Sequence, residues 1–129
     1  MKKRFFFAGL ALLLALGLLA GCGGAAPPAY TQITQEEAKA MMDEGGVLIL
    51  DVRDQDEYDA GHIPGALLLP VGSITQTAAE ALIPQKDTPV LVYCRSGNRS
   101  KTASAALAGL GYTRVYEFGG ITTWPYEVE

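Results

Sequence analysis

Short apolar runs alternate along this chain with segments that carry helix signals. The apolar runs cover residues 47–50, 66–69 and 90–93, and a last strand is expected at residues 115–117. A continuous apolar run this short is typical of a strand that is buried on both faces of a parallel sheet. Strands that alternate with helices predict an α/β domain of three layers, in which helices flank a central parallel sheet.

The expected helices are marked by capping residues at their starts and by Gly or Pro at their ends. Thr34 and Glu37 have the spacing of a capping box, so a helix is expected to follow Thr34 and to stop at the glycines 45–46. Further helical segments are expected at residues 54–60, 75–82 and 100–110. In the last of these, Leu107 lies on the face that is expected to be buried.

The first 21 residues have the pattern of a secretory signal peptide. Basic residues 2–4 precede an almost wholly apolar stretch over residues 5–20. The ending Leu-Ala-Gly-Cys at 19–22 resembles the lipobox of bacterial lipoproteins, which implies that Cys22 becomes the lipidated first residue of the mature protein. Residues 22–30 would be a flexible tether and residues 31–129 one domain, held at the bacterial cell envelope. An ordinary cleaved signal or an uncleaved anchor is the alternative.

The charge of the remaining chain excludes some classes of partner. Once residues 2–4 are removed, seven basic residues stand against fourteen acidic ones. A domain this acidic is a poor candidate for binding nucleic acid. Any contact with a membrane is therefore expected to come from the lipid anchor. The sequence leaves the oligomeric state open.

Cys94 is the most informative single residue. It follows the run 90–93, and a short loop separates it from the helix expected at 100–110. At such a position backbone N–H groups are unpaired and the helix dipole is positive, which favours a thiolate and binds anions. If Cys22 is acylated, Cys94 has no partner in the chain and is a candidate reactive thiol. A buried small hydrophobic residue is the alternative.

The loop after Cys94 is rich in groups that can bind an anion. Two guanidinium forks, a hydroxyl and a permissive backbone position come from Arg95, Arg99, Ser96 and Gly97. Polar residues that follow parallel strands meet at one edge of the sheet, so Asp51 is expected to share an edge with Cys94. A charged, glycine-containing turn without a binding role is the alternative.

These motifs resemble the rhodanese-like domains, and the likeness extends over the whole expected domain. The loop 94–100 is similar to their active-site loop, and segments 51–58 and 61–66 are similar to their upstream signature. The glycines 119–120 followed by Trp124 are similar to their C-terminal end. The resemblance implies sulfurtransferase chemistry through a cysteine persulfide, with no cofactor.

The resemblance also assigns roles to the residues of the site. Cys94 is the expected nucleophile. The expected substrate-binding residues are Arg95, Ser96, Gly97, Asn98 and Arg99. Asp51, Arg53 and Ser100 are expected to support the site. Arg95 is the choice for holding the donor oxyanion, whereas Arg99 either binds substrate or braces the loop. His62 lies in a structural loop of the family and is not expected to be catalytic.

The expected reaction has two steps. The Cys94 thiolate attacks the outer sulfur of a small anionic donor such as thiosulfate, and a thiol or cyanide then takes the sulfur. Four residues separate Cys94 from Arg99, one fewer than in the phosphatases of the same architecture, so phosphatase and arsenate reductase activities are disfavoured. A non-enzymatic persulfide carrier or regulatory binding module is the alternative. A thiol sensor of peroxide or of disulfides is a weaker alternative.

Five acidic residues between positions 51 and 59 raise the question of a metal site. The chain has one histidine and no second available cysteine, so no transition-metal site is expected. Asp56, Glu57 and Asp59 are expected to form the solvated side of a helical turn. Trp124 is expected to pack in the core.

Overall fold

The computed structural model describes residues 30–129, in which the chain winds around one parallel sheet. The five strands lie in the order β1-β5-β4-β2-β3. They are β1 (Tyr30–Gln32), β2 (Leu48–Asp51), β3 (Leu67–Leu68), β4 (Val90–Cys94) and β5 (Val115–Gly120). All pairings are parallel, as the alternation of strands and helices predicts.

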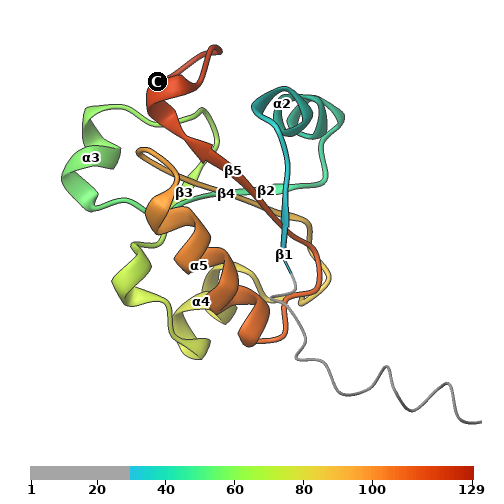
Figure 1. The fold of residues 1–129 in the computed structure, drawn as a ribbon. Helices are drawn as coiled ribbons and strands as arrows, with labels where there is room; N and C mark the ends of the chain where they lie inside the picture. Colours follow the sequence, from blue (N-terminus) through green and yellow to red (C-terminus); the bar gives the residue numbers. More distant parts are fainter. Residues whose placement is uncertain (1–29) are drawn as a thin grey trace, which may run out of the picture.

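Helices cover both faces of the sheet, so the expected three-layer α/β architecture is confirmed (Figure 1). The helices are α2 (Gln35–Glu44), α3 (Gln55–Ala60), α4 (Gln76–Leu82) and α5 (Asn98–Gly109), with short 3-10 helices η3 (Val71–Ser73) and η4 (Ile121–Thr123). On one face, Ala79 of α4 and Leu107 of α5 pack in a core with β4. On the other face, Ala38 of α2 packs in a second core with Phe118 and Trp124.

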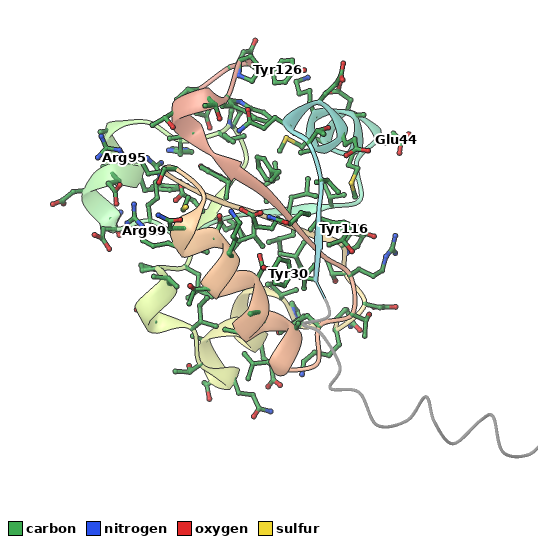
Figure 2. The ribbon with its side chains drawn as sticks, viewed as in Figure 1. Tyr30, Glu44, Arg95, Arg99, Tyr116 and Tyr126 are labelled. Carbon is green, nitrogen blue, oxygen red and sulfur yellow. The ribbon has the colours of Figure 1, made fainter. Side chains whose placement is uncertain are left out.

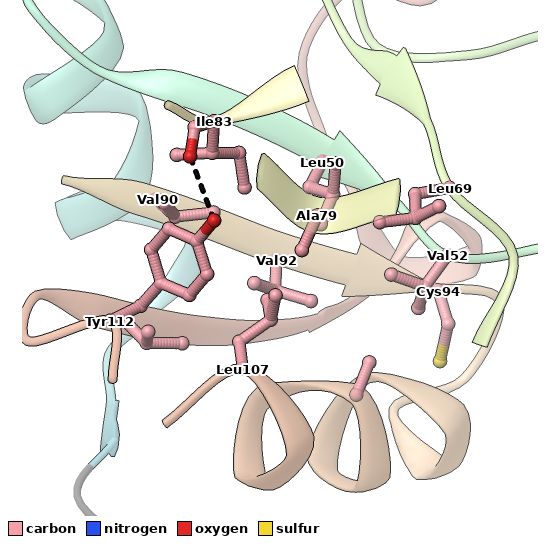
Figure 3. Packing of buried hydrophobic residues seen from close by; sticks show 12 residues of the cluster. Leu50, Val52, Leu69, Ala79, Ile83, Val90, Val92, Cys94, Leu107 and Tyr112 are labelled. Atoms are coloured by element: carbon pink, nitrogen blue, oxygen red, sulfur yellow. Dashed lines mark hydrogen bonds between the residues drawn. The ribbon is translucent and has the colours of Figure 1, made fainter. Parts of the chain in front are cut away.

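β4 is the central strand, and all of its residues are buried. Its side chains alternate between the two faces of the sheet. Val92 and Cys94 belong to the core under α4 and α5, whereas Leu91 and Tyr93 belong to the core under α2. Burial on both sides is the physical reason for an uninterrupted apolar run. Figure 3 shows Cys94 at the end of the first core, with its sulfur directed towards α5.

The helix signals that the sequence carries are confirmed. Thr34 Oγ1 accepts a hydrogen bond from Glu37 N–H at 3.0 Å, and the Glu37 carboxylate accepts one from Thr34 N–H at 2.9 Å. Gly45 follows the helix with a φ of 85°, a left-handed conformation that favours glycine. α5 starts at Asn98, two residues before the expected start. Trp124 is buried as expected, at 8% exposure.

The sequence predicts no strand at the position of β1. Its residues are exposed or half-buried, so no apolar run marks it. Its conformation comes from pairing with β5, in which Tyr30 lies opposite Val115 and Gln32 opposite Glu117. Strand formation at a sheet edge depends on such neighbours more than on local propensity.

The expected signal peptide, the lipobox residue Cys22 and the tether up to residue 29 lie outside the described residues. Within residues 30–129, no helix combines the length and the apolar character that crossing a membrane requires.

Candidate active site

Cys94 and Asp51 end neighbouring strands at the same edge of the sheet. Asp51 of β2 lies opposite Tyr93 of β4, and Val52 N–H donates to the Tyr93 carbonyl at 3.1 Å. The expected convergence of the two strand ends is therefore confirmed. The sulfur and the carboxylate nevertheless belong to separate hydrogen-bond networks.

The loop from Arg95 to Gly97 turns sharply around the sulfur of Cys94. Gly97 has a φ of 107°, in the left-handed region that glycine tolerates best. This conformation directs Gly97 N–H to Cys94 Sγ, 3.0 Å away. α5 begins with the next residue, and the backbone N–H of Ser100 in its first turn is also hydrogen-bonded to the sulfur. The expected inward N–H groups of the loop are confirmed at Gly97.

Hydrogen bonds around the sulfur favour the thiolate. Burial alone raises the pKa of Cys94, which is 1% exposed. The hydrogen bonds from Ser100 and from the backbone N–H groups of Gly97 and Ser96 outweigh that effect, so the pKa of Cys94 is lowered from its ordinary value of 9.0. A cysteine with a lowered pKa is more nucleophilic at neutral pH than an ordinary buried one.

The end of β5 supports the loop from below. A Cβ added at Gly120 would overlap the backbone carbonyl of Arg95, so only glycine fits there. The same carbonyl accepts hydrogen bonds from Thr122, at 3.2 Å from its N–H and 3.0 Å from its hydroxyl. This close approach is the physical reason for the glycine at position 120, whereas Gly119 has a φ of 92°, a conformation that favours glycine.

Arg99 braces the loop against α3. Its guanidinium donates to both carboxylate oxygens of Glu57, at 2.8 and 3.0 Å. The hydrogen bond from Arg99 lowers the pKa of Glu57 to about 2. The prediction that Glu57 is a solvated residue is wrong, because the carboxylate is only 26% exposed and forms this ion pair. Asp56 and Asp59 are exposed, as predicted.

The rest of the loop faces outward. Arg95, Ser96 and Asn98 are exposed, and within the described residues the Arg95 side chain forms no ion pair. Figure 2 shows Arg95 and Arg99 on the same side of the molecule, next to α3. The structure thus distinguishes the two arginines, since one is held by Glu57 and the other is available to a ligand.

Asp51 and Arg53 form a buried network of their own. Arg53 Nη2 donates to Asp51 at 2.7 Å and to the Gly61 carbonyl at 2.7 Å. Tyr93 donates its hydroxyl proton to Asp51 at 2.6 Å and accepts from Ile63 N–H at 3.0 Å. The network connects β2 and β4 to the loop that follows α3, where Gly61 and Ile63 lie. This arrangement agrees with a supporting role for Asp51 and Arg53.

Sequence reasoning missed the part that Tyr93 plays in this network, because the residue extends an apolar run. Burial raises the pKa of Tyr93, so its hydroxyl keeps the proton that it donates to Asp51. His62 lies in the adjoining loop. The His62 ring stacks on Tyr58, with the ring centroids 3.9 Å apart. The backbone N–H of His62 donates to the carbonyl of Glu129, so this residue holds the loop and the C-terminus together.

Ser100 contacts the sulfur from α5, with its Oγ 3.4 Å from Cys94 Sγ. The same Oγ lies 2.5 Å from Oε2 of Glu117, a residue of β5 that is 2% exposed. Sequence reasoning missed Glu117 and treated it only as part of a strand. A charged residue between two aromatic residues, Tyr116 and Phe118, at the end of an expected strand was the available signal.

The comparisons with known proteins agree with this geometry. The family model described as the rhodanese-like domain matches residues 34–126. The chain belongs to this family. A thiosulfate sulfurtransferase GlpE from Coxiella burnetii is 38% identical over 96 residues, which cover 74% of this chain and 87% of that protein. The activity of the present chain is that of a rhodanese-type sulfurtransferase.

Solved rhodanese structures share the fold. The rhodanese-like domain of an Anabaena protein superposes with a TM-score of 0.69 and 28% identity, over 81% of this chain and 80% of that one. A rhodanese with anions from E. coli superposes with a TM-score of 0.59 and 29% identity, over 64% of this chain and 95% of that one. The rhodanese-like fold expected from the sequence motifs is confirmed.

Proposed function

We propose that this protein moves sulfane sulfur from thiosulfate or a persulfide donor to a thiophilic acceptor through a persulfide on Cys94. The observation that carries the proposal is the sulfur environment. Cys94 Sγ lies 3.0 Å from the inward Gly97 N–H, and its pKa is lowered. The related proteins that bear the name thiosulfate sulfurtransferase support the choice of donor.

The reaction proceeds in two displacements. In the first, the Cys94 thiolate attacks the outer sulfur of thiosulfate, a new S–S bond forms, and the old S–S bond breaks to release sulfite. In the second, cyanide or a thiolate attacks the outer sulfur of the persulfide and returns Cys94 to the thiolate. The Gly97 N–H and the start of α5 stabilise the anionic persulfide between the two steps.

Arg95 is proposed to bind the donor oxyanion. It is exposed beside Cys94, whereas the guanidinium of Arg99 is already paired with Glu57. Ser96 and Asn98 lie on the exposed rim and add hydrogen-bonding groups, while Gly97 supplies its N–H from inside the loop. Arg99 then serves to hold the loop in shape instead of binding the donor.

A persulfide carrier without turnover of small donors is the second candidate. It is favoured by one observation, the 1% exposure of Cys94, which restricts the approach of a donor from solution. A partner protein that opens the loop could deliver sulfur to such a site. The two candidates share the persulfide and differ in whether small molecules sustain turnover.

Thiocyanate formation separates the two candidates. Protein lacking residues 1–22 is mixed with thiosulfate and cyanide, and thiocyanate is followed over time. Continuous formation that is lost in Cys94→Ser supports the enzyme. A persulfide on Cys94 without continuing turnover supports the carrier. If neither thiocyanate nor a persulfide forms, both candidates are wrong.

We also propose that the protein is exported and held at the cell envelope by a lipid on Cys22. The supporting observations are the basic start, the apolar stretch and the Leu-Ala-Gly-Cys ending at 19–22. Cell fractionation tests the proposal. The protein without substitutions is expected in the membrane fraction with a lipid on Cys22. The Cys22→Ala variant is expected to lack the lipid. An unmodified Cys22 in the membrane fraction would contradict the proposal.

A further inference from the structure

Glu117 is a buried carboxylate next to the nucleophile. Its Oε1 accepts a hydrogen bond from Gln32 Nε2 at 3.1 Å, and its Oε2 accepts from Gly119 N–H at 3.0 Å. Within the described residues it forms no ion pair with a cation. Burying a carboxylate without a counter-charge destabilises a fold, so a role in the site is a reason to keep one there.

Ser100 connects this carboxylate to the sulfur. Its Oγ lies 2.5 Å from Glu117 Oε2 and 3.4 Å from Cys94 Sγ. A serine hydroxyl has one proton and can donate it to only one acceptor at a time. The Gly119 carbonyl, 3.4 Å from Ser100 Oγ, is a third and much longer contact than the one to Glu117. The state of Glu117 therefore decides whether Ser100 can donate to the sulfur.

Two proton arrangements satisfy every group in this chain of three residues. In one, the Cys94 thiol donates to Ser100 Oγ, and the Ser100 hydroxyl donates to the Glu117 carboxylate. In the other, Cys94 is a thiolate that accepts from the Ser100 hydroxyl, and a protonated Glu117 donates to Ser100 Oγ. They differ by the transfer of one proton from sulfur to carboxylate, so protons and charge balance within the protein.

We propose that Glu117 is a positioning residue that receives, through the Ser100 hydroxyl, the proton that Cys94 gives up when it becomes the nucleophile. This inference rests on the proposed function in one respect, that Cys94 is the reacting atom. β5 thereby contributes a proton acceptor to the reaction, which none of the loop residues supplies.

The surrounding charges make such sharing favourable. The side chains that β1 and α2 bring towards Glu117 and the end of β5 are the neutral amides of Gln32 and Gln35. Of the cations on the loop and α5, Arg99 pairs with Glu57, Lys101 donates to the Gly97 carbonyl at 3.1 Å, and Arg95 is exposed.

The ion pair just after β2, between Asp51 and Arg53, is bound to Tyr93, which packs in the core on the opposite side of the sheet from Cys94. No counter-charge is therefore aimed at Glu117. A thiolate and a carboxylate one hydroxyl apart repel each other, so sharing one proton through Ser100 relieves that repulsion.

Glu117→Gln mimics the protonated carboxyl, because its amide N–H can donate to Ser100 Oγ. The Ser100 proton is then always available to the sulfur, and the buried negative charge is gone. The pH profile of Cys94 alkylation by iodoacetamide is expected to move down by about one pH unit, and Ser100→Ala is expected to move it up. A role in folding alone gives no such opposite shifts.

The decisive experiment measures these profiles for the 129-residue chain, for both single variants and for the double variant. In the Ser100→Ala background, Glu117→Gln is expected to have lost most of its effect, because the hydroxyl that links the groups is absent. Glu80→Gln is the matched control, since the Glu80 side chain is 42% exposed and pairs with Lys86, and it should leave the profile unchanged.

The proposal is overturned if Glu117→Gln leaves the profile in place, moves it upward, or shifts it equally with and without Ser100. An equal shift would mean repulsion through space without a relay. Infrared difference spectra, recorded on the protein without substitutions before and after alkylation, provide a test that needs no variant. At a pH at which Cys94 is a thiolate, its alkylation is expected to remove a protonated-carboxyl band, and an unchanged band contradicts the relay. Neither measurement uses a sulfur donor. A failure of sulfur transfer can therefore be told apart from a failure of the proton relay.

Discussion

The hydrogen bond from Gly97 N–H to Cys94 Sγ depends on a backbone conformation that suits glycine. Gly97 has a φ of 107°, and a Cβ at this position would lie 3.4 Å from Lys101 Nζ. One residue without a side chain thus sets the direction of the donor that stabilises the thiolate. The chemistry of Cys94 is therefore controlled by its neighbours in the loop as much as by the cysteine itself.

Gly97→Ala is expected to slow the reaction of Cys94. The left-handed conformation costs an alanine about 1–2 kcal/mol, and relaxation of the loop turns the N–H away from the sulfur. The pKa of Cys94 should rise, so alkylation at neutral pH should fall several-fold. Gly72→Ala is the control, because a Cβ there meets nothing within 4 Å. Equal rates for the two variants would show that the Gly97 N–H is not important.

Arg95→Gln tests the assignment of the donor-binding arginine. Removing the exposed guanidinium beside Cys94 is expected to raise the thiosulfate concentration that gives half-maximal rate by about tenfold, the loss of one charge-assisted contact. The rate at saturating thiosulfate should change much less. Arg114→Gln, at another exposed arginine, is the control. An unchanged half-maximal concentration for Arg95→Gln would move the assignment elsewhere in the loop.

At the scale of elements, the site is the meeting point of β4, β5, α3 and α5. α5 supplies Ser100 and Arg99, and β5 supplies Glu117 and the glycines under the loop. α3 contributes Glu57, which holds Arg99. The active-site loop is therefore fixed on two sides, from below by β5 and laterally by α3.

The ion pair between α3 and α5 gives a pH-dependent stability. The pKa of Glu57 is lowered from 4.5 to about 2, so its stabilisation is complete above pH 4.5 and is lost as the pH falls through about 2. Glu57→Gln keeps the hydrogen-bonding shape and removes the charge. It should lower the free energy of unfolding by about 1 kcal/mol at pH 6, after allowance for solvent screening.

Denaturant unfolding of both proteins at several pH values measures this difference. The two stabilities should converge as the pH approaches 2, because the native glutamate is then increasingly protonated. A difference that stays constant with pH would show that the ion pair does not contribute through its charge.

The sequence predicts the elements better than the contacts between them. The run 90–93, the capping box at Thr34 and the loop motif after Cys94 are local patterns, and the structure confirms the elements they predict. β1 has no local signal, because its strand conformation comes from β5.

The missed parts of the site have the same origin. In the sequence, Glu57 looks like an ordinary surface glutamate, and Glu117 stands in an expected strand with no indication of its partner. Glu57 acquires its role from Arg99, 42 positions away, and Glu117 acquires its role from Ser100, 17 positions away. Such pairings depend on how the sheet orders its strands, which the motif spacing does not contain.

At the scale of the whole molecule, two cores hold the sheet edge that carries the site. Cys94 itself belongs to the core under α4 and α5, so the packing of this core positions the nucleophile. The Tyr112 hydroxyl, which donates to the Ile83 carbonyl at 2.7 Å, ties the far end of the same core together (Figure 3). Stability and reactivity are therefore linked through shared packing.

Leu107→Ala tests the contribution of this core. Leu107 is 0% exposed, so its truncation is expected to lower the free energy of unfolding by about 2–5 kcal/mol through lost burial and a cavity. Leu67→Ala is the matched control, because Leu67 is 39% exposed on the edge strand β3, and it should cost less than about 1 kcal/mol. Similar losses in urea unfolding for both variants would contradict this description of the core.

The most direct test of sulfur transfer through Cys94 is the intact mass of the protein after incubation with thiosulfate. The protein lacking residues 1–22 is expected to gain the mass of one sulfur atom, to lose it again when cyanide is added, and to gain nothing as Cys94→Ser. A protein whose mass does not change, or a Cys94→Ser variant that gains the same sulfur, would contradict a persulfide on Cys94.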